Sequence, residues 1–134
     1  MIIVWVNKRD WKTPGPIVNM AVHNAASFSD LGYESHLCIG AGPPSHTRKD
    51  LETFYEITQR PHFRIHRIPR YRLGNATYSI SVFFHAYKLI QELSRRDQVA
   101  VFTRDSGFLF FLHRLCKKIK TVKAIMNFMT CMRT

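Results

Sequence analysis

The sequence is short of acidic residues, and this shortage narrows the range of partners. Asp and Glu together number 9 against 20 Lys and Arg, so the formal net charge is +11 and the pI is about 10.1. A chain this basic attracts something anionic, such as nucleic acid, phospholipid head groups or a phosphorylated small molecule. The basic residues are spread along the chain, with the densest group at residues 64–72.

Cysteines and long apolar runs are also scarce. Cys38, Cys116 and Cys131 are odd in number and widely spaced, which fits neither a disulfide framework nor a CxxC site. We therefore expect a reducing compartment, the cytoplasm, and no disulfide-linked partner. No apolar run approaches the roughly 18 residues that a membrane span needs. The apolar start at residues 2–6 also lacks the basic flank and cleavage site of a signal peptide.

Phosphate-loop, metal and nucleophile motifs are missing as well. The chain contains no GxxxxGK[ST], no HExxH and no GxSxG. The loop after the first apolar run has only Gly15 where a dinucleotide fingerprint needs three glycines, and the pair Gly40 and Gly42 lacks the third. We therefore expect no metal site and no cofactor in this chain.

What the sequence does contain is a regular alternation of short apolar runs and helical patterns. Strands are expected at residues 2–6, 33–39, 63–68, 98–103 and 121–126, and helices at 17–31, 45–57, 80–93 and 108–119. Residues 69–75 read as a loop. This alternation predicts an α/β fold: one domain over residues 1–134, with a doubly wound, mainly parallel five-stranded sheet and helices on both faces.

The strand order follows from the pattern of each strand. The third strand alternates apolar and basic residues, as a strand at the edge of a sheet does, whereas the first and fourth are apolar and therefore central. This predicts the order 3-2-1-4-5. In that order the connections leave strands one and four in opposite directions, and such sheets bind ligands in the crevice at the C-terminal ends of those strands.

Basic, aromatic and hydroxyl side chains follow those two strands. The residues expected to bind substrate in the crevice are Lys8, Arg9, Asp10, Trp11, Thr13, Gly15, Thr103, Arg104, Asp105 and Ser106. A guanidinium binds oxyanions and an indole face stacks on a ring, so this set suits a sugar, a lipid head group or a phosphate.

Several of these residues have a plainer interpretation. Asp10 and Asp105 could approach one another across the crevice and act as bases, or they could simply solvate a loop and cap a helix. Arg9 could lie in a solvated loop, and Trp11 could pack against a neighbouring domain. Catalytic residues therefore stay unassigned.

Three stretches carry a family resemblance. They are the apolar first strand with its Gly15-Pro16 loop before the helix, the helix end Leu31-Gly32 followed by the strand at 33–36, and the later strand at 99–104. With them the chain resembles the N-terminal, Rossmann-like domain of GT-B-fold glycosyltransferases, particularly the retaining, family-4-like group. The resemblance implies an acceptor-side domain of a transferase that moves a sugar from a nucleotide-sugar donor to a glycan, lipid or small-molecule acceptor.

The same resemblance implies a partner and a cleft. A C-terminal donor-binding domain, in cis or in trans, would bind the nucleotide sugar and face residues 13–15 and Thr103-Arg104. Residues 108–111 would be core or interdomain packing. The chain departs from the family in having no histidine at 127–130 and no residues that match the donor-domain Glu-rich motif. We therefore expect that the chain is a fragment or a separate subunit that is inactive alone. Its cysteine usage and basic charge lead us to expect a cytoplasmic location with peripheral contact at an anionic membrane surface.

Two other classes fit parts of the sequence. A basic nucleic-acid-binding module would explain the charge, although its aromatic residues should be interleaved with Lys and Arg on one face. A flavodoxin-like nucleotide-binding module would explain the five strands, although a receiver domain needs paired acids at the end of strand one, where the chain has only Asp10.

Overall fold

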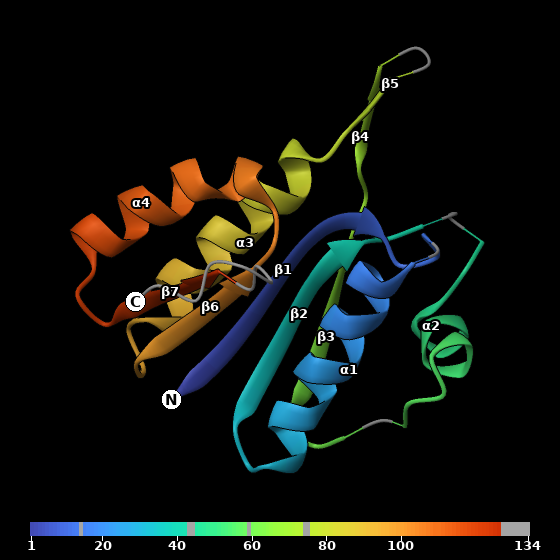
Figure 1. Ribbon diagram of the computed structural model, residues 1–134, viewed down its shortest axis with the longest axis horizontal. Coiled ribbons are helices and arrows are strands. Elements are labelled where there is room, and N and C mark those ends of the chain that lie inside the picture. Colours follow the sequence, from blue (N-terminus) through green and yellow to red (C-terminus); the bar gives the residue numbers. More distant parts are fainter. Residues whose placement is uncertain (14, 43–44, 59, 74–75, 127–134) are drawn as a thin grey trace.

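The computed structural model describes residues 1–13, 15–42, 45–58, 60–73 and 76–126, and only the backbone of residues 71–73, 76–78 and 126. The expectations about Pro14, Cys131 and residues 127–130 lie outside these ranges. Five parallel strands form the main sheet (Figure 1), namely β1 (Ile2–Asp10), β2 (Glu34–Gly40), β3 (Phe63–Ile68), β6 (Val99–Thr103) and β7 (Val122–Met126). Their order is β3-β2-β1-β6-β7, which confirms the predicted 3-2-1-4-5 arrangement.

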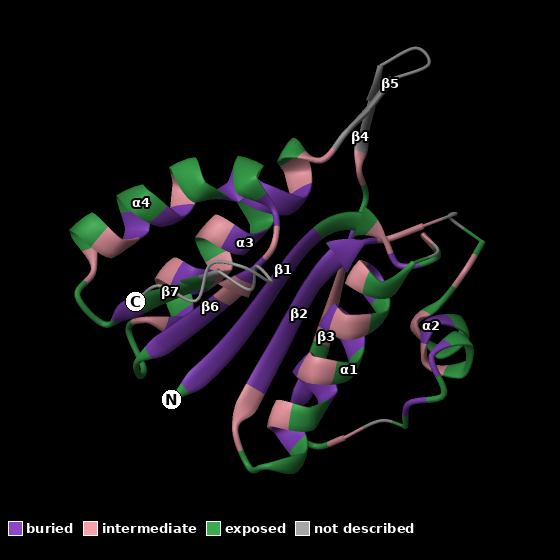
Figure 2. Cartoon of the chain, viewed as in Figure 1, coloured by how far each residue is buried: buried purple, intermediate pink, exposed green. Residues whose placement is uncertain are grey.

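Helices cover both faces of this sheet, as the doubly wound pattern predicts. They are α1 (Pro16–Asp30), α2 (Arg48–Phe54), α3 (Ile80–Leu93) and α4 (Leu109–Lys118). In β1, Ile2, Val4 and Val6 pack with α3 and α4, whereas Ile3 and Trp5 pack with α1 and α2. Because side chains of a strand alternate between faces, β1 has to be apolar on both, and Figure 2 shows it buried over most of its length.

Local signals in the sequence set the ends of α1 and α2. Pro16 stands at the start of α1, where a missing N–H costs nothing, and Gly32 follows the helix with a φ of 96°. The Thr47 side chain accepts a hydrogen bond from the Asp50 amide, and Asp50 accepts one from the Thr47 amide. This capping box starts α2 at Arg48. The helix ends at Phe54, and Glu56, with a positive φ of 54°, redirects the chain two residues later.

The structure differs from the sequence prediction between β3 and α3. Strands β4 (Tyr71–Leu73) and β5 (Ala76–Tyr78) form an antiparallel hairpin that projects from the body of the domain (Figure 1), where residues 69–75 were expected to be a loop. Three-residue strands are too short to show an alternating pattern, so the sequence did not reveal them. Ser79 then precedes α3 without a side-chain capping bond.

Candidate functional site

The predicted crevice lies at the C-terminal ends of β1 and β6. From there the chain enters α1 on one face of the sheet and, through a 3₁₀ turn at Ser106–Phe108, α4 on the other. A hollow of about 260 Å³ opens at this point. It is lined by Lys8, Arg9, Ile17, Arg104, Asp105 and Ser106. The structure thus brings together five of the ten residues expected to bind substrate, and we call this hollow the basic crevice.

The end of β1 extends past β6, so Lys8 and Arg9 lie beside the segment that follows β6. Pairing between β1 and β6 stops at Val6, and the pairing of β1 with β2 shifts register between Val6 and Asp10. Asp105 Oδ2 accepts the amide N–H of Lys8 at 2.7 Å, and the buried Asn7 accepts the amide of Arg9 at 2.9 Å. Side chains therefore replace strand pairing here, since buried backbone donors must be satisfied.

Thr103 and Asp105 are structural supports of the crevice. Thr103 is fully buried, and its hydroxyl donates to the Val6 carbonyl at 3.0 Å and accepts from the Asp105 amide at 3.0 Å. Burial raises the pKa of Asp105, while the Lys8 amide and the charges of Lys8 and Arg9 act in the opposite direction. The crevice therefore presents cations at its surface and holds its carboxylate beneath them.

A second, larger hollow of about 530 Å³ lies beside the start of α1. Thr13, Gly15, Pro16, Asn19 and His23 line one side, and Phe54, Tyr55 and Glu56 line the other. The first turn of α1 has no side-chain cap and no acidic residue. Its amide donors and the positive end of the helix dipole favour anions between the two hollows. Thr13 and Gly15 thus belong to the larger hollow and not to the basic crevice.

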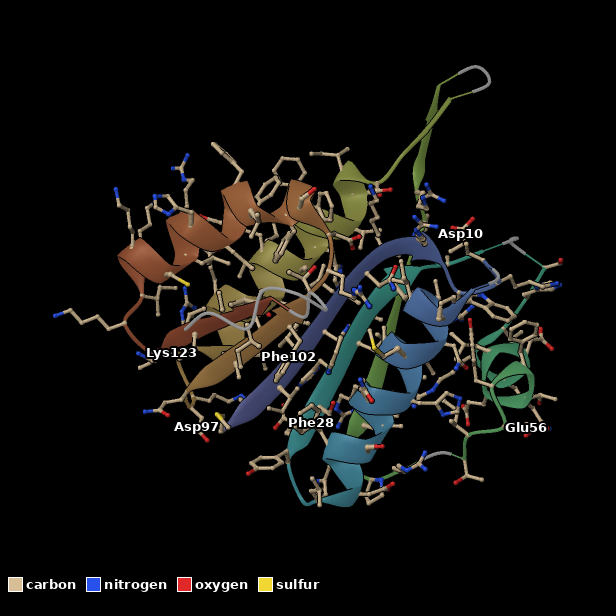
Figure 3. The ribbon with its side chains drawn as sticks, in the orientation of Figure 1. Asp10, Phe28, Glu56, Asp97, Phe102 and Lys123 are labelled. Atoms are coloured by element: carbon tan, nitrogen blue, oxygen red, sulfur yellow. The ribbon has the colours of Figure 1, made fainter. Side chains whose placement is uncertain are left out.

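Asp10 does not pair with Asp105. Asp10 lies at the end of β1 (Figure 3), opposite Gly40 of β2, and its carboxylate pairs with Arg70 at 3.3 Å, whereas Asp105 follows β6. Asp10 ends β1 on the side that pairs with β2, whereas Asp105 follows β6 and binds the backbone of Lys8, so the two acids do not meet.

Trp11 lies in the protein core, where it cannot offer an indole face to a ligand. Its side chain is 1% exposed, its Nε1 donates to the Ala41 carbonyl at 2.8 Å, and its ring contacts Phe54 and His46. The residue after a strand is placed by the loop that follows it, and here that loop turns Trp11 under α2.

The structure also shows two features that sequence reasoning missed. Ile17 forms the apolar side of the basic crevice, as its place in the first turn of α1 could have suggested. A row of three imidazoles, His36, His66 and His85, joins β2, β3 and α3, and it forms through the pairing of β2 with β3 and the packing of α3 against them. Within the described ranges, no group of three or more His, Cys, Asp or Glu side chains could hold a metal ion.

The structure is that of an α/β protein with a Rossmann-like sheet and a basic crevice at the carboxyl edge of that sheet. Comparison of the chain with protein-family models, with curated proteins and with solved structures finds no match. In the part of the chain that the structure describes, no helix is long and apolar enough to cross a bilayer.

Proposed function

We propose that this domain is the acceptor-side domain of a glycosyltransferase that moves a sugar from a nucleotide-sugar donor to a glycan, lipid or small-molecule acceptor. The observation that carries the proposal is the basic crevice, where Lys8, Arg9 and Arg104 gather at the point of the sheet from which the connections diverge. Parallel sheets bind ligands at this point.

The chemistry of the crevice fits a polar, anionic acceptor. Arg104 can take a phosphate or carboxylate in a bidentate way, Lys8 supplies a point charge, and Ser106 supplies a hydroxyl that can donate or accept. Ile17 gives the crevice one apolar side, as a sugar ring or lipid stem needs. Asp105 holds the backbone of Lys8 and so positions the cations.

The crevice opens at the carboxyl edge of the sheet, and its lining residues come from β1, α1 and the segment after β6. A donor-binding domain, in cis or in trans, would form the opposite side and bring the nucleotide sugar, whose phosphates would lie near the unpaired first turn of α1. We therefore propose that residues 1–134 alone bind no cofactor and do not turn over a nucleotide sugar. The proposed setting is the cytoplasm, with which the free thiols of Cys38 and Cys116 agree.

An NMR titration of the ¹⁵N-labelled chain tests the acceptor role. Sugars, sugar phosphates and free phosphate are added in turn, and the amides of Lys8, Arg9 and residues 104–107 are expected to shift with the sugar phosphates at lower concentration than with phosphate. Arg104→Ala should weaken this binding roughly tenfold or more, because a charged hydrogen bond contributes about 1.5–3 kcal/mol. Lys49→Ala, an exposed cation on α2, is the matched control and should change nothing.

Three results would contradict the proposal. Turnover of a nucleotide sugar by residues 1–134 alone would show that the donor site is within this chain. Retention on RNA with a steep salt dependence, and no response to sugars, would favour a nucleic-acid-binding module. A bound flavin spectrum would favour a flavodoxin-like module.

A further inference from the structure

Large apolar side chains are exposed side by side on α3 and α4. Phe110 is 68% exposed and Phe84 is 54% exposed, and Ile80 and Leu109 are exposed as well. The ring of Phe111 lies between the two outer phenyl rings, with centroids 5.4 Å from Phe84 and 5.8 Å from Phe110. Ile80 lies one turn before Phe84 on α3, and Leu109 directly precedes Phe110 on α4; we call these four exposed side chains the aromatic patch.

The protein core does not account for this patch. Residues 108–111 were expected to be core or interdomain packing, and Phe108 is indeed fully buried and Phe111 partly so. Phe110 turns outward instead, and α4 is exposed along its outer side (Figure 2). Single exposed apolar residues are common on protein surfaces, but adjoining ones from two helices mark a surface that contacts something apolar.

Cations extend from the patch along both helices. On α4, Arg114 and Lys117 lie one and two turns after Phe110 on the same side of the helix, with Lys118 beside them. On α3, Lys88 lies one turn after Phe84. All four cations are exposed, and α4 contains no acidic residue. Across the described residues, no carboxylate lies within ion-pair distance of any of the four.

We propose that the face formed by α3 and α4 docks on the surface of an anionic lipid bilayer. The aromatic patch would enter the boundary between head groups and acyl chains, and Lys88, Arg114, Lys117 and Lys118 would contact lipid phosphates. Peripheral proteins bind anionic membranes through exposed aromatic side chains that lie beside clusters of Lys and Arg.

Charge decides between a membrane and a protein partner. The cores of protein interfaces are depleted in lysine, whereas an anionic bilayer attracts each Lys or Arg near its surface. The outer surface of α4 therefore matches a bilayer better than a second folded domain. This inference does not rest on the proposed transferase function, because binding to lipid needs no sugar, no donor domain and no basic crevice.

Flotation with lipid vesicles tests the proposal on residues 1–134. Vesicles of phosphatidylcholine alone are compared with vesicles that contain about 30% phosphatidylglycerol, at about 0.1 M and about 0.5 M salt. We expect binding to the anionic vesicles at low salt and much less binding at high salt. Circular dichroism of every variant confirms that it is folded.

Two double variants separate the apolar and the charged contributions. Lys117→Glu with Lys118→Glu should weaken binding roughly 25-fold or more, because each lost cation near an anionic surface costs about fivefold. Phe84→Ser with Phe110→Ser should weaken it roughly tenfold or more through lost apolar contact. Lys49→Glu and Leu31→Ser, an exposed cation and an exposed apolar residue elsewhere, are the matched controls and should bind as the unaltered chain does.

The proposal is overturned if the unaltered chain does not float with anionic vesicles. It is also overturned if Lys49→Glu weakens binding as much as the charge reversal on α4, since the attraction would then come from net charge alone. If the chain does not bind vesicles but light scattering shows a dimer, and the Phe84→Ser, Phe110→Ser variant is a monomer, the patch is assigned to contact with a second copy. Capture of a donor-binding domain through the patch, again without vesicle binding, would assign it to interdomain packing.

Discussion

The row of imidazoles that joins β2, β3 and α3 should make the protein lose stability in mild acid. Glu34 accepts a hydrogen bond from His36 Nε2 at 2.7 Å, so the other nitrogen of a neutral His36 is free to accept. His66 Nε2 lies 3.0 Å from that nitrogen, and His66 Nδ1 lies 3.4 Å from His85 Nε2. Each imidazole can therefore donate to the one before it, provided that all three are neutral.

A second proton on either inner imidazole disrupts this row. Burial, with smaller effects from the neighbouring His36 and His85 and from the charges of Arg64 and Arg48, lowers the pKa of His66 to about 4. Burial also lowers the pKa of His36, against the opposing effect of Glu34. Unfolding releases both imidazoles into water, where a histidine has its ordinary pKa near 6.5.

The sign of the effect follows from these pKa values. Between pH 6.5 and 4 the unfolded chain binds more protons than the folded one, so the free energy of unfolding falls as the pH falls through this window. Above pH 6.5 the contribution of His66 is constant. Glu34, whose pKa is lowered to about 2 chiefly by the hydrogen bond from Arg96, loses its contribution only below its ordinary value of 4.5. Glu34 therefore titrates below the pH window in which His66 affects stability.

The magnitude is set by His66. A pKa lowered from 6.5 to about 4 corresponds to at most about 3.4 kcal/mol, at about 1.36 kcal/mol for each pH unit. His66 is only partly buried, so water screens its charge and we expect about 1–2 kcal/mol between pH 7.5 and pH 4.5. Urea unfolding followed by circular dichroism at pH 7.5, 6 and 4.5 measures it.

Matched variants show whether the imidazole row is responsible. His66→Gln keeps a donor and an acceptor but cannot titrate in this range, so its free energy of unfolding should vary less with pH. His23→Gln, on the exposed side of α1, should behave as the unaltered chain does. The reasoning is refuted if His66→Gln and the unaltered chain lose the same stability between pH 7.5 and pH 4.5.

Three further substitutions test the structure around the site, each by urea unfolding. Trp11→Ala should lower the free energy of unfolding by about 3–5 kcal/mol, because it empties a buried position and leaves the Ala41 carbonyl without its donor. Leu31→Ala, at an exposed position, should change it by no more than about 0.5 kcal/mol, and equal effects would mean that Trp11 is not in the core. Thr103→Val should cost about 1–3 kcal/mol because it removes both hydrogen bonds of the hydroxyl, and an unchanged midpoint would contradict them. Gly40→Ala should cost about 1–3 kcal/mol because its Cβ would lie 3.0 Å from the Arg9 carbonyl oxygen, and a larger effect from Gly107→Ala, which meets only the ring of Phe83, would reverse the expected order.

The candidate site was predictable only in part, and Asp10 and Asp105 show why. Both were placed in one crevice because both come after an apolar run, yet Asp10 pairs with β2 and binds Arg70, whereas Asp105 binds the backbone of Lys8. Position after a strand predicts the edge of the sheet at which a residue lies. It does not predict the side of the strand, because that depends on the register shift between Val6 and Asp10.

Trp11 and Phe110 show the same limit for burial. A tryptophan in a polar loop reads as exposed, and a phenylalanine in an apolar run reads as buried, but the structure has Trp11 in the core and Phe110 outside it. Burial depends on which element covers a residue, and the capping of α2 and the packing of α4 on α3 decide this from parts of the chain that are distant in sequence.

The five strands of the main sheet, the four α-helices and the order of those strands could be predicted from the chain alone. Apolar periodicity, Pro16 and Gly32 act within a few residues, and the polarity of β3 determines that it lies at the edge of the sheet. The basic crevice, the imidazole row and the aromatic patch arise from contacts between residues tens of positions apart. Such contacts depend on strand register and on helix packing, which no local pattern encodes, and tertiary structure was needed to reveal all three.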